Sequence, residues 1–337
     1  MVTVSSGARL HFGFQNLSLA HDRLYGGVGV GLAEPRVAVS AVAADAVAVD
    51  AAADATPAVG TDERADLDAA RRYAERAVEI LGVDGAHVTV ERTLPRHVGL
   101  GSGTQLALAT YTAVARANDV DPRPREHAPA LGRGGRSGVG VATFESGGFV
   151  VDAGHPTARF TTDEPARGEW ETPPVVARHA LPDDWRFVLG LPDADAGRNG
   201  DAEAASMRSV VERADGTVAD AVAGALTRTL LPAAATDDRK RFADGMSELG
   251  HRNGAWYADE QGGVFRPPVG EIVESLSRSD AVGGVGQSSW GPAVYALTDT
   301  THVDSALDAA RNALDAADVD GDALAVAPAT SGARITD

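Results

Sequence analysis

Three glycines at the junction of a predicted strand and a predicted helix constrain the fold of this 337-residue chain more than any other feature. Alternating valines predict a strand over residues 86–93, and a helix-forming run follows over 104–118. Gly99, Gly101 and Gly103 lie between them. Such a turn lets backbone N–H groups approach an anion at the positive end of the helix dipole. A tight turn that needs glycine only for its dihedral angles would look the same, so both readings stay open.

The glycine turn lacks the signatures of two common nucleotide-binding loops. No Lys-Ser/Thr pair follows it, as a Walker-type loop requires. Its glycine spacing also differs from the G-x-G-x-x-G of dinucleotide-binding folds. The chain contains no cysteine, which excludes disulfides, thiolate nucleophiles and cysteine-ligated metal sites.

The charge balance is strongly acidic, with a formal net charge of −18, and Lys240 is the only lysine. This balance disfavours nucleic acids and anionic membranes as partners. It suits high salt, where screening reduces the self-repulsion, so we expect a halophilic protein. A leader of charged and then apolar residues after Met1 is not visible, nor is an apolar run of about 18 residues, so with no cysteine present we expect a cytoplasmic protein. Arginines within glycine-rich segments therefore stand out as local anion-binding candidates.

The first part of the chain reads as strands followed by an amphipathic helix. Residues 1–50 alternate in hydropathy, and Arg9 and His11 share one strand parity, so both could point into one cleft. A surface arginine and a hydrogen-bonded core histidine are the alternative. Residues 63–81 predict a helix whose N-cap is Thr61 or Asp62.

A second glycine-rich segment covers residues 132–140 and contains Arg133 and Arg136. Its flanks are β-like, with residues 141–145 on the C-terminal side, which favours an anion nest over a flexible connector. Glu145 lies beyond it and reads either as a metal or base carboxylate or as a charge at a strand edge.

Residues 155–184 are rich in proline and acidic residues and lack periodicity, which predicts a domain boundary. We expect an N-terminal domain over residues 1–170 and a C-terminal domain over 180–337. In the second domain the patterns predict strands at 185–191, 293–297 and 322–327, and helices at 201–213, 217–231, 236–252, 269–279 and 302–316.

A third glycine- and serine-rich loop, residues 282–292, precedes the strand at 293–297. Such a loop could close over a ligand held by the first glycine turn. A simple link between a helix and a strand is the alternative.

The three loops, in this order, resemble those of the GHMP kinase superfamily. The matching motifs are Pro95-x-x-x-Gly-Leu-Gly-Ser102, Ser137-Gly138 leading to Gly147-Gly148, and the loop before the strand at 293–297. The resemblance implies an α+β fold of two domains. The first would be similar to domain 2 of ribosomal protein S5 and the second to ferredoxin, with phosphate held between them.

Two positions depart from the kinase pattern. Superfamily kinases with a carboxylate base read Pro-Ser-Gly-x-Asp in the middle motif, and here the last position is Gly140. The second serine of the phosphate loop, which helps kinases to hold Mg-ATP, is replaced by Gly103. Phosphoryl transfer would therefore lack its usual base and one ligand, although some kinases of the superfamily work without the carboxylate.

Longer motifs are similar to one branch of the superfamily, the β-ribofuranosylaminobenzene 5′-phosphate synthases of methanopterin biosynthesis. They are Gly99-Leu-Gly-Ser-Gly-Thr-Gln-Leu106, Gly132-Arg-Gly-Gly-x-Ser-Gly-x-Gly140, Glu145-x-Gly-Gly-Phe149, Asp152-x-Gly-His155 and Ser288-Ser-x-Gly-Pro292. The resemblance implies a pentosyltransferase that joins phosphoribosyl pyrophosphate to 4-hydroxybenzoate or 4-aminobenzoate and releases pyrophosphate and CO2. It also implies a homodimer, no organic cofactor and an open question about Mg²⁺, for which no protein ligands are assigned.

On this hypothesis residues 99–105 bind the pyrophosphate and Arg133 and Arg136 neutralise it, since stabilising the leaving anion is what the reaction most needs. Arg9, Arg23 and His11 would hold the 5′-phosphate or the benzoate carboxylate. The catalytic candidates are Arg9, His11, Asp22, Arg133 and Glu145. The phosphate-binding candidates are Gly99, Leu100, Gly101, Ser102, Gly103, Thr104, Gln105, Arg136, Ser137, Gly138, Ser288 and Ser289, and the substrate-binding candidates are Asn16, Arg23, Gly26 and Gly27.

Two candidate positions differ from the pattern of that family. Asn16 and Tyr25 replace residues that are usually acidic, and Asp22 is the nearby carboxylate that could compensate. The alternatives are thus a paralogue with another acceptor, an ATP-dependent small-molecule kinase of the superfamily, and a weakly catalytic protein that binds a phosphometabolite.

Overall fold

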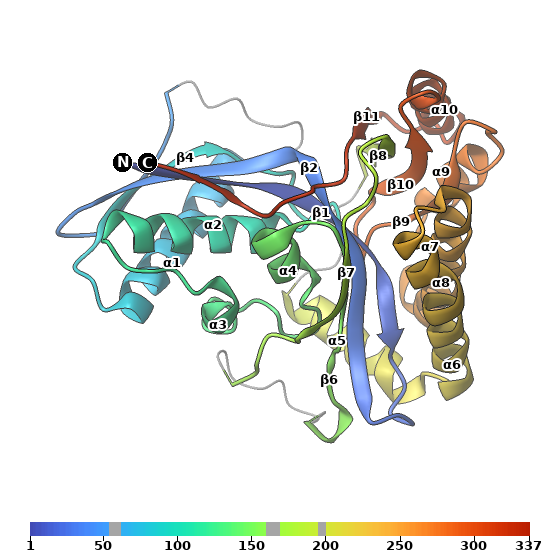
Figure 1. Ribbon diagram of the computed structural model, residues 1–337, viewed down its shortest axis with the longest axis horizontal. Coiled ribbons are helices and arrows are strands. Elements are labelled where there is room, and N and C mark those ends of the chain that lie inside the picture. The colour runs from blue at the N-terminus through green and yellow to red at the C-terminus, as the bar shows by residue number, and fades with distance from the viewer. Residues whose placement is uncertain (54–61, 160–168, 195–199) are drawn as a thin grey trace.

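Two β-sheets with helices packed against them make up the part of the chain that the computed structural model describes, residues 1–53, 62–159, 169–194 and 200–337 (Figure 1). The larger sheet has eight strands: β1 (Val2–Asn16), β2 (Arg23–Ala43), β3 (Ala48–Ala51), β4 (Ala86–Arg92), β5 (Phe149–Asp152), β6 (His155–Pro156), β7 (Val175–His179) and β12 (Arg334–Thr336). The smaller sheet is ordered β11 (Gly321–Val326), β8 (Trp185–Pro192), β10 (Val294–Asp299), β9 (Gly283–Gln287).

The helices divide between the two sheets. Those associated with the larger sheet are α1 (Glu63–Leu81), α2 (Ser102–Ala117), α3 (Pro124–His127) and α4 (Val139–Ser146), and a short 3₁₀ turn covers Thr157–Arg159. The second half contains α5 (Gly200–Arg213), α6 (Gly216–Ala225), a π-helical turn (Leu226–Leu230), α7 (Leu231–Ala235), α8 (Arg239–Gln261), α9 (Val269–Leu276) and α10 (Val303–Ala316).

The strand-turn-helix unit predicted around the glycines is β4, the 93–101 loop and α2. Its neighbour α1 begins and ends where the sequence indicates. The Asp62 side chain caps it by accepting a hydrogen bond from the amide of Ala65 at 3.1 Å, and Gly82 ends it in the left-handed conformation. Thr61, the other predicted cap, lies outside the described residues. Small alanines on its buried face bring α1 close to α2.

The long hairpin of β1 and β2 joins the two halves of the molecule. Figure 1 shows its far end beside α6 and α8, and the amide of Phe14 donates a hydrogen bond to Asn253 of α8 at 2.6 Å. The ring of Phe12 lies 6.4 Å from Phe242 of α8 and 5.1 Å from Tyr295 of β10, centroid to centroid. Each fully buried phenylalanine contributes roughly 1.5–3 kcal/mol through removal from water, so this shared core fixes the halves against each other.

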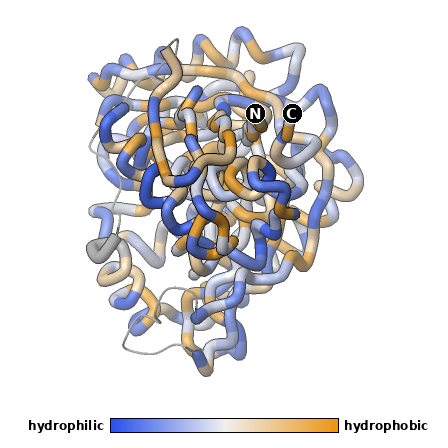
Figure 2. The backbone as a smooth tube through the Cα atoms, turned by 90° about the vertical axis from the view of Figure 1, so that its left-hand side faces the viewer, coloured by the Kyte–Doolittle hydropathy of each residue, from blue (hydrophilic) through white to orange (hydrophobic). Residues whose placement is uncertain are grey.

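The chain returns to the larger sheet at its end. Strand β12 pairs with β1, with Val4 opposite Ile335, and the two termini lie side by side in both views (Figures 1 and 2). Strand β7 also pairs with the larger sheet, through β5. The predicted boundary between residues 170 and 180 stays a prediction.

One prediction about the elements is wrong. Residues 141–145, predicted to be β-like, belong to helix α4, which is buried over Val139–Phe144. A continuous apolar run does not distinguish a buried helix from a buried strand. In Figure 2 hydrophilic and hydrophobic residues alternate along the outer helices, as expected for helices with one face on a core. Among the described residues no helix is long and apolar enough to cross a membrane.

Candidate functional site

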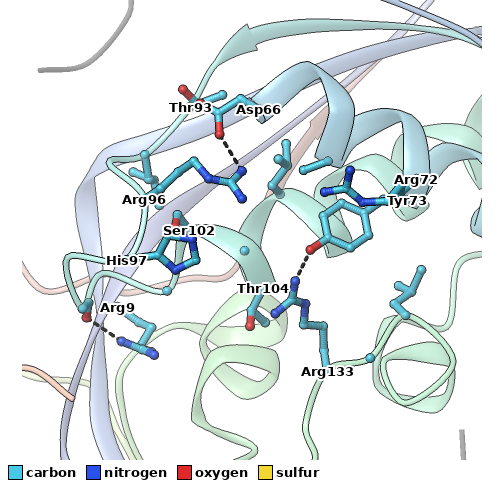
Figure 3. A pocket seen from close by; sticks show the side chains of 18 of the residues that line it. Arg9, Asp66, Arg72, Tyr73, Thr93, Arg96, His97, Ser102, Thr104 and Arg133 are labelled. Carbon is cyan, nitrogen blue, oxygen red and sulfur yellow. Dashed lines mark hydrogen bonds and ion pairs between the residues drawn. The ribbon is translucent and has the colours of Figure 1, made fainter. Parts of the chain in front are cut away.

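A cavity of about 750 Å³ opens directly above the glycine turn (Figure 3). Its walls come from α1, the 93–104 segment, residues 131–133 and the turn at 289–291, so both halves of the molecule contribute. This volume is typical of pockets that enclose a small molecule.

The glycine turn forms the floor of this cavity. Gly99 and Gly101 have φ angles of 99° and 78°, which side chains other than glycine rarely adopt. Gly101 is the N-cap of α2, and no side chain caps this helix, so its first amides are not used by a capping side chain. Ser102 and Thr104 line the cavity beside them. The floor therefore offers amide donors at the positive end of a helix dipole.

Two residues of the predicted loop support it from below and do not line the cavity. Leu100 is 1% exposed and lies in the core. The buried amide of Gln105 accepts a hydrogen bond from the hydroxyl of Ser6 at 2.6 Å and donates one to the carbonyl of Gly140 at 2.9 Å. The side chain of Gln105 thus ties α2 to β1 and α4.

Arg9 and Arg133 lie directly against the loop glycines (Figure 3). Nη1 of Arg9 donates to the carbonyl of Gly99 at 2.6 Å, and a Cβ built on Gly101 would meet its Cγ at 2.9 Å. A Cβ on Gly103 would meet Nη2 of Arg133 at 3.0 Å. The absence of a side chain at Gly101 and Gly103 is what lets two guanidinium groups flank the loop.

Two aromatic residues fix the position of Arg133. Its Nη2 donates a hydrogen bond to the hydroxyl of Tyr73 on α1, and its guanidinium carbon lies 5.3 Å from the centre of that ring. Nε1 of Trp170 donates to the backbone carbonyl of Arg133 at 2.9 Å. The guanidinium is therefore held over the loop before any ligand arrives.

Four basic residues that the sequence analysis did not select also line the cavity. They are the arginines Arg72 and Arg76 of α1 and Arg96 of the loop, and the histidine His97 beside it. Burial lowers the pKa of His97, and the charges of Arg96 and Arg133 lower it further. The spacing of four between Arg72 and Arg76, which places both on one helix face, is the signal that could have identified them.

The third glycine-rich loop packs against the first. The hydroxyl of Ser288 donates to the carbonyl of Gly99 at 2.7 Å and accepts from the amide of His11 at 3.1 Å. A Cβ on Gly291 would lie 2.0 Å from the backbone of Val98, so only glycine fits. Ser289 lines the cavity, whereas Ser288 is fully buried beneath it.

His11 does not share the cavity of Arg9, which differs from the expected common cleft. His11 lines a narrow slot beside Phe14, and Ser289 and Trp290 form the wall that this slot shares with the large cavity. The physical reason is the inserted turn, whose Ser289 amide donates to the His11 carbonyl at 3.1 Å.

A hydrogen-bonded chain links the buried side chains of His11 and Asp152 through the half-buried Ser137. The hydroxyl of Ser137 donates to Oδ2 of Asp152 at 3.2 Å and lies 3.1 Å from Nε2 of His11. Because that hydroxyl donates to the carboxylate, it accepts from a protonated Nε2. The amide of Gly138 also donates to Asp152, at 2.7 Å.

Burial sets the ionisation of this chain. It lowers the pKa of His11 to about 3, helped by the charge of Arg9, so the imidazole is neutral at pH 7. Burial also raises the pKa of Asp152 to about 6, against hydrogen bonds from Gly154, Gly138 and Gly27 that favour the carboxylate. His11 therefore offers hydrogen bonds rather than positive charge.

Asn16 and Arg23 stabilise the end of the β1–β2 hairpin. The amide of Asn16 donates to the carbonyls of Ser18 and Arg23, both at 2.7 Å. Arg23 in turn donates to the carbonyls of Ala153 and Gly154, at 2.5 and 2.7 Å. Neither Asn16 nor Arg23 lines the large cavity, and their observed contacts are structural.

The remaining predicted residues also lie outside the cavity lining. Asp22 is exposed at the hairpin turn, and Glu145 forms an ion pair with Arg125 at 2.7 Å. Gly26 and Gly27 allow β2 to approach its neighbours; a Cβ on Gly27 would lie 2.0 Å from the Ser137 hydroxyl oxygen. Arg136 and Ser137 are half-buried and Gly138 is buried at the N-terminus of α4.

At Gly140 and Gly103, the two positions that depart from the kinase pattern, neighbouring side chains fill the space that a larger residue would need. A Cβ on Gly140 would approach Cγ2 of Thr104 to 3.1 Å, which leaves a carboxylate little room. The guanidinium of Arg133 covers Gly103, where the second serine of the kinase loop would begin. Within the described ranges, no group of three or more His, Asp or Glu side chains could hold a metal ion.

Comparison with family models gives two matches. The model described as the GHMP kinases N terminal domain matches residues 67–148, which include the glycine turn and Arg133. The model described as GHMP kinases C terminal matches residues 230–316, which include the turn at 288–291.

Two relatives with assigned names match most of the chain. The β-ribofuranosylphenol 5′-phosphate synthase of Methanothermobacter thermautotrophicus is 33% identical over 298 residues, covering 88% of this chain and 88% of that protein. The protein of the same name from Archaeoglobus fulgidus is 30% identical over 301 residues, covering 89% of this chain and 88% of that protein.

Solved structures support the fold. Homoserine kinase from Cytophaga hutchinsonii superposes with a TM-score of 0.65 at 15% identity, covering 99% of this chain and 97% of that one. Mevalonate diphosphate decarboxylase from Staphylococcus aureus superposes with a TM-score of 0.66 at 13% identity, covering 100% and 99%. With the family models, these similarities confirm the predicted α+β, GHMP-kinase-like fold.

Proposed function

Because this chain belongs to the β-ribofuranosylphenol 5′-phosphate synthase family of the GHMP kinase superfamily, we propose that it is a pentosyltransferase that uses phosphoribosyl pyrophosphate and 4-hydroxybenzoate. The observation that carries this proposal is the pair of guanidinium groups, Arg9 and Arg133, packed against an uncapped helix N-terminus. In a chain with a net charge of −18, this is a local concentration of positive charge that suits a polyanion.

The leaving pyrophosphate binds the amides of the glycine turn, with Arg9 on one side and Arg133 on the other. Its negative charge grows as the bond to C1 of the ribose breaks, and preorganised donors stabilise that change without rearranging. Tyr73 keeps Arg133 in place for this purpose. A Mg²⁺ ion here would depend on substrate oxygens for most of its ligands, as is usual for this ion, and no step is assigned to it.

The reaction balances without a covalent intermediate on the protein. The C1–O bond breaks and its electron pair leaves with pyrophosphate, and the ring carbon that bears the carboxylate supplies the pair for the new C1–C bond. The bond to the carboxylate then breaks, CO2 leaves, and its electrons restore aromaticity. The para oxygen donates electron density to the ring while the ring carbon attacks C1. The product keeps this oxygen as a phenol hydroxyl.

The names of the relatives favour 4-hydroxybenzoate over 4-aminobenzoate, since their product is named a ribofuranosylphenol. Loss of the carboxylate from 4-hydroxybenzoate leaves a phenol, whereas loss from 4-aminobenzoate leaves an aminobenzene. The aromatic wall at Trp290, whose ring lies 4.5 Å from Tyr257, provides an apolar surface for such an acceptor.

Phosphoryl transfer from ATP is the alternative with the same fold, and two contacts disfavour it. Thr104 crowds the position of the kinase carboxylate at Gly140, and Arg133 covers the position of the second loop serine at Gly103. A kinase that lacks both would have to supply its base and metal ligand from elsewhere.

One assay with two arms tests the proposal. The purified protein in high salt receives phosphoribosyl pyrophosphate with 4-hydroxybenzoate in one arm, and ATP with candidate alcohols in the other. We expect equal amounts of CO2 and pyrophosphate in the first arm and no alcohol-dependent ADP in the second. ADP release that requires an alcohol would overturn the proposal. Binding of phosphoribosyl pyrophosphate without turnover would indicate a phosphometabolite-binding protein instead.

A further inference from the structure

We infer that the α1 side of the large cavity is a second anion site, which binds the terminal 5′-phosphate of the phosphoribosyl substrate. This inference rests on the proposed function and names the residues for the other end of the same molecule. Those residues are Arg72 and Arg76 of α1 together with Arg96 of the loop.

The geometry separates these arginines from the pair at the glycine turn. In Figure 3, Arg72 and Arg96 come from α1 and the loop, while Arg133 comes from residues 131–133 beside Thr104 and reaches Tyr73 of α1. A pyrophosphate held by Arg9 and Arg133 would leave Arg72, Arg76 and Arg96 without a bound anion. The substrate carries its two anionic groups on opposite sides of a ribose, so it is the kind of ligand that two groups of arginines in one cavity recognise.

Two carboxylates of the α1 wall form ion pairs with arginines of the same wall, and one arginine is left without such a pair among the described residues. Arg96 pairs with Asp66 at 3.0 Å, and Arg76 pairs with Glu79 at 2.9 Å. Arg72 has no hydrogen bond or ion pair within the described part of the chain, although it lines the cavity beside Tyr73 (Figure 3). Glu75 is the remaining carboxylate of the lining. A guanidinium without a partner can give two parallel hydrogen bonds to a phosphate.

Two other arginines that the sequence suggested for anion binding, Arg23 for the 5′-phosphate or carboxylate and Arg136 for the pyrophosphate, are placed less well for the 5′-phosphate. Arg23 gives its hydrogen bonds to the carbonyls of Ala153 and Gly154, and it does not line the cavity. Arg136 does not line it either. A cavity of about 750 Å³ exceeds what a diphosphate alone would fill, so the ribose and its phosphate have space toward α1.

Calorimetric titrations of Arg72→Ala and Arg71→Ala with two ligands test this site. Arg71 is the matched control, because it is the adjacent exposed arginine of α1 and lines a different, shallow cavity beside Asp68. We expect Arg72→Ala to weaken phosphoribosyl pyrophosphate by about tenfold, as the loss of one charge-assisted contact would. Inorganic pyrophosphate should bind this variant as it binds the wild type, and Arg71→Ala should change neither affinity.

The outcomes distinguish this inference from the proposed function. Wild-type affinity of Arg72→Ala for phosphoribosyl pyrophosphate would overturn the 5′-phosphate site and leave the proposed function intact. An equal loss for pyrophosphate would also overturn it, because Arg72 would then belong to the pyrophosphate site. A wild-type protein that neither binds nor turns over phosphoribosyl pyrophosphate would overturn the proposed function itself.

Discussion

At the scale of single residues, the candidate site depends on where guanidinium groups are held. Arg133 is constrained from both ends: Tyr73 accepts a hydrogen bond from its guanidinium, and Trp170 donates one to its carbonyl. An arginine fixed in this way loses less side-chain entropy on binding an anion than a mobile one. The contribution of Arg133 should therefore depend on Tyr73.

Arg133→Ala should weaken the binding of phosphoribosyl pyrophosphate by roughly 1–3 kcal/mol, the usual range for a hydrogen bond to a charged group. Arg136→Ala is the internal comparison, since Arg136 lies three residues later but does not line the cavity. Titration of both variants measures the difference. Our assignment of the pyrophosphate site would be wrong if Arg133→Ala bound as the wild type does.

Tyr73→Phe should lower kcat/KM for phosphoribosyl pyrophosphate by about fivefold, which corresponds to roughly 1 kcal/mol for the lost hydrogen bond. The ring stays, so the packing of α1 should not change. Steady-state kinetics of Tyr73→Phe, Arg133→Ala and the double variant form a thermodynamic cycle. Tyr111→Phe is the control, since its hydroxyl bonds to His127 at 2.5 Å and does not line the cavity. Additive effects of the first two changes would contradict a positioning role.

The buried carboxyl of Asp152 should make the folded protein less stable as pH rises. Its pKa is raised to about 6 by burial, from an ordinary value of 3.8. Between these values the folded state holds a proton that the unfolded state has lost, so this group's contribution to the unfolding free energy falls with rising pH. The fall is on the order of 3 kcal/mol and is complete above the folded pKa.

Denaturant unfolding of the wild type and Asp152→Asn at several pH values between about 4 and 7 would detect this effect. The difference in unfolding free energy between the two proteins should shift with pH in favour of the variant, since asparagine does not titrate. The absolute stability of the variant is not the test, because its amide also changes the bonds to Gly138 and Gly154. A difference that stays constant with pH would contradict a raised pKa.

At the scale of elements, the glycine turn and the 132–140 segment fit each other only because Gly103 has no side chain. Gly103→Ser, which restores the serine of the kinase pattern, should displace Arg133, whose Nη2 would lie 3.0 Å from the new Cβ. We expect about a tenfold loss in affinity for phosphoribosyl pyrophosphate, from misplacing one charged contact. Gly190→Ala controls for substitution of a buried glycine, since its Cβ would meet Val294 at an ordinary 3.8 Å. Unchanged affinity in Gly103→Ser would mean that the arginine is free to adjust.

The elements differ in how well the sequence predicts them. Helix α1 has a cap residue, an amphipathic face and a terminal glycine, and its predicted bounds match. Helix α4 is buried on all sides over Val139–Phe144, so its apolar residues carry no periodic signal, and the sequence predicts a β-like segment there. The glycine turn was predicted from local pattern alone because strand, turn and helix are adjacent in the chain.

The candidate site was harder to predict, because its parts meet only in the folded molecule. The contact between His11 and Ser288 joins residues 277 positions apart, and no local pattern encodes it. Arg72 and Arg96 lie outside the glycine-rich segments, so a pattern of arginines among glycines does not include them. Asn16 and Glu145 have chemistry suited to catalysis, but their observed partners are a backbone turn and Arg125.

At the scale of the whole molecule, the net charge of −18 predicts a protein whose stability rises with salt. Repulsion among carboxylates opposes the compact state, and salt screens it over a Debye length that falls from about 10 Å at 0.1 M to about 3 Å at 1 M. The melting temperature should therefore rise steeply as KCl increases from about 0.1 M to about 1 M and then level off, because little repulsion remains to screen. Sucrose at matched osmolality controls for changes in hydration that do not involve charge. A melting temperature that is flat or falls over this range would show that the surface charge is not destabilising, and that the acidic composition needs another explanation.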